Sequence, residues 1–221
     1  MTIDRPGRPA DLPAPELLWA RWALAAVVQA SAAGERETGY RTGCWIDDEG
    51  LHLDDCGGTW WTFTRVAEGR WVLYGEDESS GAKWYEPPVD MLAGGPDWLP
   101  YEELRDRLSG NELGCVYWYE DGAWGRAPYP ADLDDDGLDC GMSRFVVRAE
   151  ALLLLRELAR EAVRGPGDAA AVDAAALLEL AEAYALTPDE LTAAAGEAPE
   201  LPAMLRELDR AGLGARAAAA G

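Results

Sequence analysis

The sequence contains one histidine and one lysine among its 221 residues, and both shortages limit what the protein can be. Because His52 is the single imidazole, metal centres that need several histidines are excluded. Arginine supplies the remaining 18 basic residues, and Ala, Gly and Pro are abundant. That composition is typical of a GC-rich bacterial genome and does not indicate a particular function.

The usual signatures of nucleotide binding and nucleophilic catalysis are also missing. There is no GxGxxG after a strand pattern, no GxxxxGK[ST] loop and no GxSxG elbow. The four cysteines lack CxxC spacing, so we expect small core residues in a reducing compartment rather than zinc ligands. The sequence therefore predicts no cofactor and provides no catalytic motif.

Long hydrophobic runs are missing as well. The most apolar early stretch, residues 17–33, is interrupted by Arg21 and Gln29 and is too short to span a bilayer. The first 16 residues have no basic region followed by an apolar core, so we expect no secretion signal. The prediction is a cytoplasmic protein that does not bind membranes.

Acidic residues outnumber basic residues by 41 to 19, which gives a formal net charge of −22. The excess is concentrated in residues 34–145, which hold 25 acidic and nine basic residues. Such a charge repels nucleic-acid phosphates and anionic membranes, and it favours basic partners, divalent cations or simply solubility. We therefore predict a basic protein partner and no nucleic-acid partner.

Tryptophan divides the chain into two compositional parts. All ten tryptophans lie between Trp19 and Trp124, whereas residues 146–221 are rich in Ala and Leu. We expect a flexible N-terminus over residues 1–14 and an acidic, aromatic-rich α+β domain over residues 15–145. A helical region over residues 146–221 is expected to pack on that domain.

The fold class that these patterns predict is α+β. We expect a first helix from about Pro15, which suits the first helical turn, to residue 33, with an apolar stripe of Leu18, Trp22, Ala25 and Val28. Alternating residues bounded by turn sequences then indicate strands within residues 40–46, 51–55, 59–66, 71–77 and 114–130. We expect an antiparallel β-meander of about five or six strands, packed with the N-terminal helix on one face and followed by the α-helical C-terminal region. In that region, Thr187 and Glu190 form a capping-box pattern.

One group of carboxylates surrounds the single histidine. It consists of Asp47, Asp48, Glu49, Asp54 and Asp55 near His52. A hydrolase can hold a metal with one histidine and two carboxylates. However, the spacing matches neither HExxH nor an EF-hand loop, and DDEG is ordinary hairpin-turn chemistry. We interpret the group as solvated turns and predict no metal ligands.

A second group, Glu76, Asp77 and Glu78, follows the strand pattern WVLYGED. Neighbouring carboxylates serve as acid and base only where burial separates their pKa values. Alternation along a strand also places Asp77 on the side opposite to Glu76 and Glu78. We interpret the segment as an exposed loop that belongs to a contact surface, not as a catalytic motif.

The hairpins hold more Trp and Tyr than one buried sheet face can accommodate. We therefore expect a few aromatic side chains at the surface, namely Trp61, Tyr119 and Trp124. The predicted partner-binding set is Trp61, Tyr74, Glu76, Asp77, Glu78, Tyr119, Asp121 and Trp124.

Residues 177–196, LLELAEAYALTPDELTAAAG, resemble part of the helix–turn–helix of phage-repressor-type DNA-binding proteins. The resemblance implies a recognition helix, which needs Lys or Arg to contact phosphates. Neither residue occurs between Gly165 and Met204. We therefore interpret the segment as helical packing.

Charge and aromatic hairpins together favour an acidic protein-binding module. Its most concrete form is an immunity-type inhibitor that occludes a basic bacterial enzyme or toxin, such as a nuclease. The alternative is a metal-dependent hydrolase or small-ligand-binding protein with a carboxylate site at the strand ends, near Glu76, Glu78, Asp121 and His52. An inhibitor would expose its carboxylates and aromatics on a flat or convex face, whereas an enzyme would gather them in a deep cleft. An acidic decoy of DNA would need two rows of carboxylates, and the sequence shows scattered turns.

Overall fold

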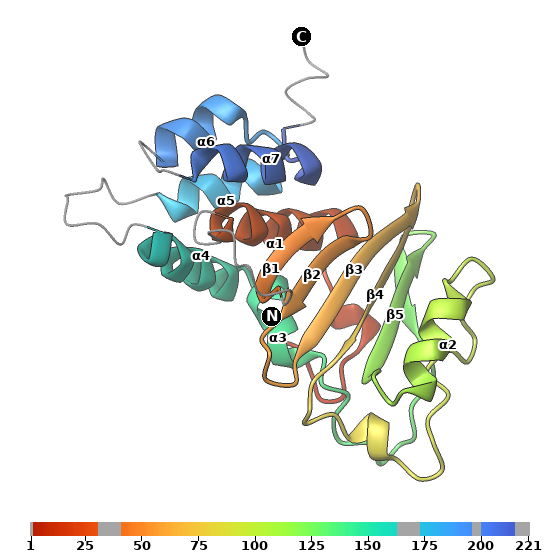
Figure 1. Cartoon of the computed structure of the whole chain (residues 1–221). Helices are drawn as coiled ribbons and strands as arrows, with labels where there is room; N and C mark the ends of the chain where they lie inside the picture. The colour runs from red at the N-terminus through yellow and green to blue at the C-terminus, as the bar shows by residue number, and fades with distance from the viewer. Residues whose placement is uncertain (1, 31–40, 163–172, 196–199, 215–221) are drawn as a thin grey trace.

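Six strands follow one another in the sheet in chain order, each antiparallel to the next. The computed structural model describes residues 2–30, 41–162, 173–195 and 200–214 (Figure 1). The strands are β1 (Gly43–Asp47), β2 (Gly50–Asp54), β3 (Trp60–Ala67), β4 (Arg70–Glu76), β5 (Cys115–Glu120) and β6 (Ala123–Arg126). The helices are α1 (Pro15–Gln29), α2 (Tyr101–Ser109), α3 (Asp139–Val146), α4 (Arg148–Ala162), α5 (Ala174–Glu182), α6 (Pro188–Ala195) and α7 (Leu201–Ala211), with short 3-10 helices η1 (Pro9–Asp11) and η2 (Gly81–Trp84). The α+β meander expected from the sequence is confirmed.

The meander places successive connections at opposite ends of the sheet. Tight turns close the β1–β2, β3–β4 and β5–β6 hairpins, and they all lie at one end, the turn end. The β2–β3 loop and the long connection from β4 to β5 lie at the other end, the loop end. Residues in neighbouring hairpin loops along the sequence are therefore separated by the length of a strand.

Helix α1 lies against one face of the sheet and forms the centre of the main core. Alternation along β3 turns Trp61 and Phe63 toward this helix, as the sequence indicated. The Trp22 ring stacks on Phe145, with ring centroids 4.8 Å apart. Helices α4, α5 and α7 contact the remaining surface of α1, so almost the whole helix is buried.

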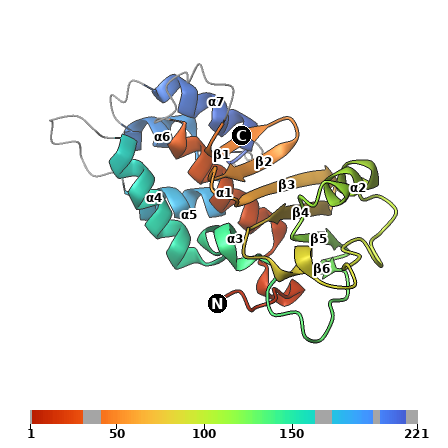
Figure 2. The same ribbon diagram turned by 60° about the horizontal axis from the view of Figure 1, so that its bottom comes forward.

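A second core covers the opposite face of the sheet. There, Val72, Tyr74 and Val116 pack against α2 and the connection that precedes it. Figure 2 shows α2 on one side of the strands and α4–α7 on the other. The expectation of helices on one face is therefore wrong, and the second covered face explains how so many aromatic side chains are buried.

One buried charge joins the first helix to the C-terminal region. Arg21 of α1 donates to Glu182 of α5 at 2.8 Å and to the carbonyl oxygen of Val146 at 2.7 Å. Because a buried guanidinium needs such partners, the contacts fix how α1, α3 and α5 meet. Residues of α4–α7 share one apolar core with the sheet.

The N-terminal residues also have defined contacts. The Trp124 indole donates to the carbonyl oxygen of Pro13 at 2.7 Å, and Leu12 is buried. The backbone N–H of Gly7 donates to Asp136 at 2.9 Å. These contacts place the described part of residues 1–14 against β6 and the loop after it, in contrast to the flexible N-terminus expected from composition.

The C-terminal helices follow the sequence signals closely. Thr187 and Glu190 exchange the capping-box bonds: the N–H of Thr187 donates to the Glu190 carboxylate at 2.8 Å, and the N–H of Glu190 donates to Oγ1 of Thr187 at 3.3 Å. The expected continuation of the first helix to residue 33 lies outside the described residues. None of the described helices has the length and apolar character needed to cross a membrane.

Candidate functional site

Three segments meet at the loop end of the sheet and form what we call the acidic rim, residues 54–59, 76–86 and 131–140. The N–H of Gly81 donates to the carbonyl oxygen of Asp135 at 3.0 Å, and Thr59 donates to Asp77 at 2.5 Å, so the three segments are in direct contact. They hold eleven carboxylates and one lysine. The rim lies at the lower end of the sheet in Figure 1. It is therefore the most strongly charged end of the sheet.

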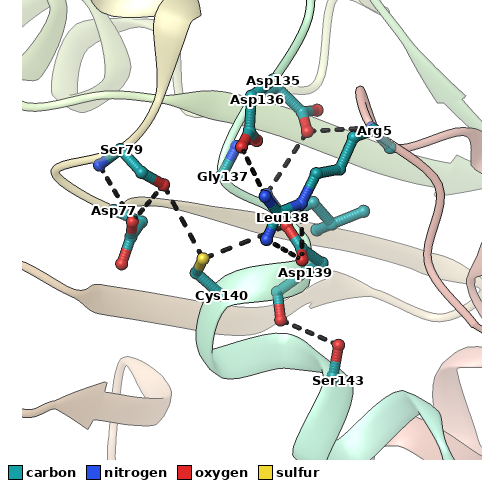
Figure 3. A network of polar contacts seen from close by, with 11 residues as sticks. Arg5, Asp77, Ser79, Asp135, Asp136, Gly137, Leu138, Asp139, Cys140 and Ser143 are labelled. Atoms are coloured by element: carbon teal, nitrogen blue, oxygen red, sulfur yellow. Dashed lines mark hydrogen bonds and ion pairs between the residues drawn. The ribbon is translucent and has the colours of Figure 1, made fainter.

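The Asp77 side chain connects two of the rim segments by hydrogen bonds. Its carboxylate accepts hydrogen bonds from the backbone N–H of Ser79 at 2.9 Å and from the Ser79 hydroxyl (Figure 3). It also accepts a hydrogen bond from the Thr59 hydroxyl. Burial by itself raises the pKa of Asp77, but these hydrogen bonds outweigh burial and leave the pKa below its usual value. The side chain is buried, so Asp77 organises the loop and is not part of an exposed contact surface.

Cys140 lies beside Asp77 but lacks the surroundings of a nucleophile. Its Sγ is 3.7 Å from the Ser79 hydroxyl (Figure 3). Burial raises the pKa of the Cys140 thiol, and the negative charges of Asp77 and Asp139 raise it further. A thiol with a raised pKa is a poor nucleophile, and the single imidazole of the chain is bonded to other residues.

Two cations neutralise the inner part of the rim. Arg5 reaches over from the N-terminal segment and donates to Asp139 at 2.6 Å, with Asp135 3.5 Å away. Lys83 forms an ion pair with Glu76, and both side chains are largely buried. The Glu76 carboxylate is therefore already paired with a cation of the same chain. The exposed rim carboxylates that form no ion pair among the described residues are Asp55, Glu78, Glu86, Asp132 and Asp134.

Trp84 is the exposed aromatic residue of the rim. With 69% of its surface exposed, it exceeds Leu153 and Val66, the other exposed large apolar residues of the described chain. It ends η2 directly after Lys83, whose ammonium lies 5.8 Å from the centre of the Trp84 ring. The exposure of Trp84 could be predicted from the sequence, because GAKW lies outside any strand alternation and is flanked by turn residues.

Two aromatic residues of the predicted partner-binding set lie in the cores instead. Trp61 has no exposed surface and faces α1, which corrects the expectation that it lies at the surface. Gly141, with φ of +81°, passes so close that a Cβ there would be 3.0 Å from the Trp61 indole nitrogen. Tyr74 is buried on the opposite face, where its hydroxyl donates to Glu103 at 2.6 Å.

Three further residues of the set lie at the turn end, far from Glu76. Strand pairing aligns Cys115 with Gly75, and Asp121 follows six residues after Cys115, at the exposed β5–β6 turn. An extended strand of that length spans about 20 Å. Glu76 and Asp121 therefore cannot belong to a single carboxylate site, because they lie at opposite ends of the sheet.

Tyr119 and Trp124 lie near that turn and are only half-buried. Their rings pack edge to face with centroids 5.4 Å apart. Trp124 is also bonded to Pro13, so its indole nitrogen is already used within the fold. Neither ring is the freely exposed anchor that the sequence suggested.

The third rim segment contains a pattern that sequence reasoning missed. Asp132, Asp134, Asp136 and Gly137 fit the D-x-D-x-D-G opening of a calcium loop, although the twelfth position is Ser143 instead of Glu. The structure uses the third carboxylate differently. Asp136 turns inward and accepts hydrogen bonds from the N–H groups of Gly7 and Leu138. The D-x-D-x-D-G segment therefore forms a turn that is held by hydrogen bonds within the fold.

Two surface hollows flank α2 and do not include the rim. The first is lined by Leu92, Tyr101 and Arg105 among others, and the second by Pro100, Glu102 and Asp106. The ribbon of the rim segments lies beyond the lower ends of the strands in Figure 1.

No protein-family model, curated protein or solved structure matches this chain. The fold and its site define an acidic α+β protein that carries an exposed tryptophan on the acidic rim at one end of its sheet.

Proposed function

We propose that this protein is an acidic protein-binding module and that it contacts a basic protein partner through the acidic rim. The observation that carries the proposal is the position of Trp84, an exposed indole within a surface of carboxylates. Tryptophan is among the residues most often found at the energetic centre of protein interfaces. An exposed tryptophan in a strongly charged surface therefore favours recognition of a partner of opposite charge.

The two components of the rim have separate roles in this proposal. Exposed carboxylates such as Glu78, Glu86 and Asp134 add to the long-range field of a chain with net charge −22, and they accelerate encounter with a basic surface. Trp84 buries apolar area once the partner is in place and slows dissociation. Charge therefore acts mainly on the association rate, and the indole acts on the dissociation rate.

The most concrete form of the module is an immunity-type inhibitor that occludes a basic bacterial enzyme or toxin. A rim at the end of the sheet suits occlusion, because it can enter or cover the cleft of another protein. We place the complex in the cytoplasm, and the four free cysteines fit a reducing compartment. The hydrolase alternative has less support, because two of its carboxylates, Glu76 and Asp121, lie at opposite ends of the sheet.

The proposal is tested by capture of the partner from the lysate of the native host, followed by binding kinetics with the purified partner. Capture is carried out at about 0.05 M salt and repeated at about 0.5 M salt, where the Debye length is only about 4 Å. We expect a basic protein at low salt and less of it at high salt. Kinetics are then measured for Trp84→Ala, for the rim variant Glu78→Gln/Glu86→Gln/Asp134→Asn, and for a matched control at the turn end, Asp48→Asn/Glu68→Gln/Asp121→Asn.

Both triple variants remove three exposed carboxylates, so they change the net charge equally. We expect the rim variant to lower the association rate at least about fivefold more than the control does, and Trp84→Ala to raise the dissociation rate at least about tenfold. Equal effects of the two triple variants, together with an unchanged dissociation rate for Trp84→Ala, would place the contact elsewhere and refute the rim as the binding surface.

A further inference from the structure

The β1–β2 hairpin gathers three side chains that are able to bind a metal ion: Asp47, Glu49 and His52. One ligand atom from each lies within 4.8 Å of the other two. Within the described ranges, no other set of three or more His, Cys, Asp or Glu side chains meets that spacing. The hairpin turn is at the turn end of the sheet, so this group is separate from the acidic rim.

The ring of His52 is held with one nitrogen toward the carboxylates. Its Nε2 is 2.9 Å from Oδ1 of Asp47, and its Nδ1 is 3.2 Å from Oγ1 of Thr62. Thr62 lies on β3 directly across from His52 and is buried. The hydrogen bond to the Asp47 carboxylate requires the proton on Nε2, with Nδ1 accepting from the Thr62 hydroxyl. In the other tautomer Nδ1 donates to Thr62, and the lone pair of Nε2 is free to bind an ion. Histidines that bind metals usually have their second nitrogen bonded to an oxygen in this way.

Trp45 holds the side chains of both His52 and Asp47 in place. The rings of Trp45 and His52 stack with centroids 5.1 Å apart and planes 17° apart. The Trp45 indole also donates to Oδ2 of Asp47 at 3.2 Å, which leaves Oδ1 directed at the imidazole. The His52 side chain is 12% exposed, so a small ion can reach it from solvent. Since two of the three groups are already oriented, little ordering is needed on binding.

The charges around the group suit a dication. The Asp47 carboxylate accepts hydrogen bonds from the N–H of Glu49 at 3.0 Å and from the Trp45 indole at 3.2 Å. Glu49 and Asp48 are exposed in the turn beside it, so three carboxylates lie together at the hairpin turn. The Arg41 guanidinium lies over the Trp45 ring, at 5.5 Å from the ring centre.

We propose that Asp47, Glu49 and His52 bind one divalent transition-metal ion of the Zn²⁺, Co²⁺ or Ni²⁺ class, with water completing the coordination. An imidazole nitrogen with two carboxylate oxygens is a ligand set that these ions accept. Ca²⁺ and Mg²⁺ prefer ligands that are all oxygen. The ion replaces the hydrogen bond between His52 and Asp47 and draws in the exposed Glu49, which ties β1, the turn and β2 together.

Titration calorimetry of the untagged full chain with ZnCl2 tests the site. The measurement is made at about 0.15 M salt with excess Mg²⁺, which occupies the diffuse ion atmosphere of an acidic protein. We expect one Zn²⁺ per chain, an affinity at least about tenfold weaker in Glu49→Gln, and no site-specific binding in His52→Gln. Glu68→Gln, a matched change at the exposed β3–β4 turn, is expected to bind as the wild type does.

A second measurement keeps the test valid even if His52→Gln fails to fold. His52 is the single histidine of the sequence, so its ring gives the one imidazole signal in an NMR spectrum of the untagged protein. We expect Zn²⁺ to shift that signal and Co²⁺ to shift it much further. Unshifted ring signals at saturating Zn²⁺, or equal Zn²⁺ affinity in Glu49→Gln and Glu68→Gln, would overturn the proposal.

Discussion

The hydroxyl of Tyr117 lies 2.8 Å from Oδ2 of Asp136, and both side chains are buried between the sheet and the N-terminal segment. The same hydroxyl is 2.7 Å from the carbonyl oxygen of Gly7. A hydroxyl has one proton, so it can donate to only one of these acceptors at a time. A proton on Asp136 allows both contacts, because the carboxyl group then donates to Tyr117 while Tyr117 donates to Gly7.

The first prediction concerns how much unfolding free energy is lost when the Asp136 carboxyl group is removed. In Asp136→Ala the buried N–H groups of Gly7 and Leu138 lose their acceptor, which is expected to cost roughly 3 kcal/mol or more of unfolding free energy. In Asp136→Asn one oxygen remains for those donors and the amide donates to Tyr117, so the expected loss is about 1 kcal/mol. Urea unfolding followed by far-UV circular dichroism measures both, and equal losses would contradict the inferred donor role.

The same site makes stability depend on pH. Burial raises the pKa of Asp136 above its unfolded value, although hydrogen bonds from Gly7, Tyr117, Leu138 and Tyr129 partly oppose this. The folded state then binds more protons than the unfolded state between the two pKa values. The contribution of Asp136 to stability is therefore fully present below its unfolded pKa, about 3.9, and is lost as pH rises through the folded pKa. We expect this dependence to disappear in Asp136→Asn.

The second prediction concerns Asp77, whose contribution to stability changes with pH in the opposite direction. Its pKa is lowered in the folded state, so its contribution is present above the unfolded pKa of about 3.9 and is lost as pH falls through the folded pKa. Asp77→Asn is expected to be clearly less stable than the wild type at pH 7, with the difference shrinking below about pH 4. Glu78→Gln, the same type of change at the exposed neighbouring position, serves as the control and is expected to show no such trend.

The third prediction compares two tryptophans. Trp61 is enclosed between β3, α1 and the backbone of Gly141, so Trp61→Ala leaves a large cavity and is expected to cost about 3–5 kcal/mol. Trp84 is mostly in solvent, and Trp84→Ala is expected to change stability by less than about 0.5 kcal/mol. Thermal unfolding of the two variants measures the contrast. A large loss in Trp84→Ala would mean that this side chain supports the fold and is not free to contact a partner.

The fourth prediction concerns the start of α6. Thr187→Ala removes the hydroxyl that accepts the Glu190 N–H and leaves the Glu190 carboxylate without one of its donors. We expect a loss of about 1 kcal/mol. Thr187→Ser retains the hydroxyl and is expected to recover most of the loss, and denaturant unfolding of both variants checks it. If the two variants lose equal amounts, the methyl group and not the cap is responsible.

Much of the fold could be predicted from the sequence because its signals are local. Alternation gave the strands around Trp61 and Leu73, Pro15 marked the start of α1, and the Thr187 box marked α6. The covering of the second sheet face could not be predicted in the same way. It depends on contacts between Val72 and α2, which are far apart in sequence and produce no periodic pattern.

The candidate site was predicted less well, for two physical reasons. Sequence alternation states which residues share a strand face but not whether that face is covered, so Trp61 was expected at the surface and Trp84 was overlooked. The separation of Asp121 from Glu76 could be predicted from the sequence, because a meander places alternate loops at opposite ends of its sheet.

The buried contact between Gly7 and Asp136 spans 129 residues of chain, and Arg21 is bonded to Glu182, which is 161 residues away. During synthesis the first helix is therefore made long before the segments that satisfy its buried charge. At roughly 5–20 residues per second, the ribosome needs several seconds or more to supply them. We expect the native core to close only after most of the chain has been made. Until then, the aromatic strands remain exposed and are protected from association chiefly by their own negative charge.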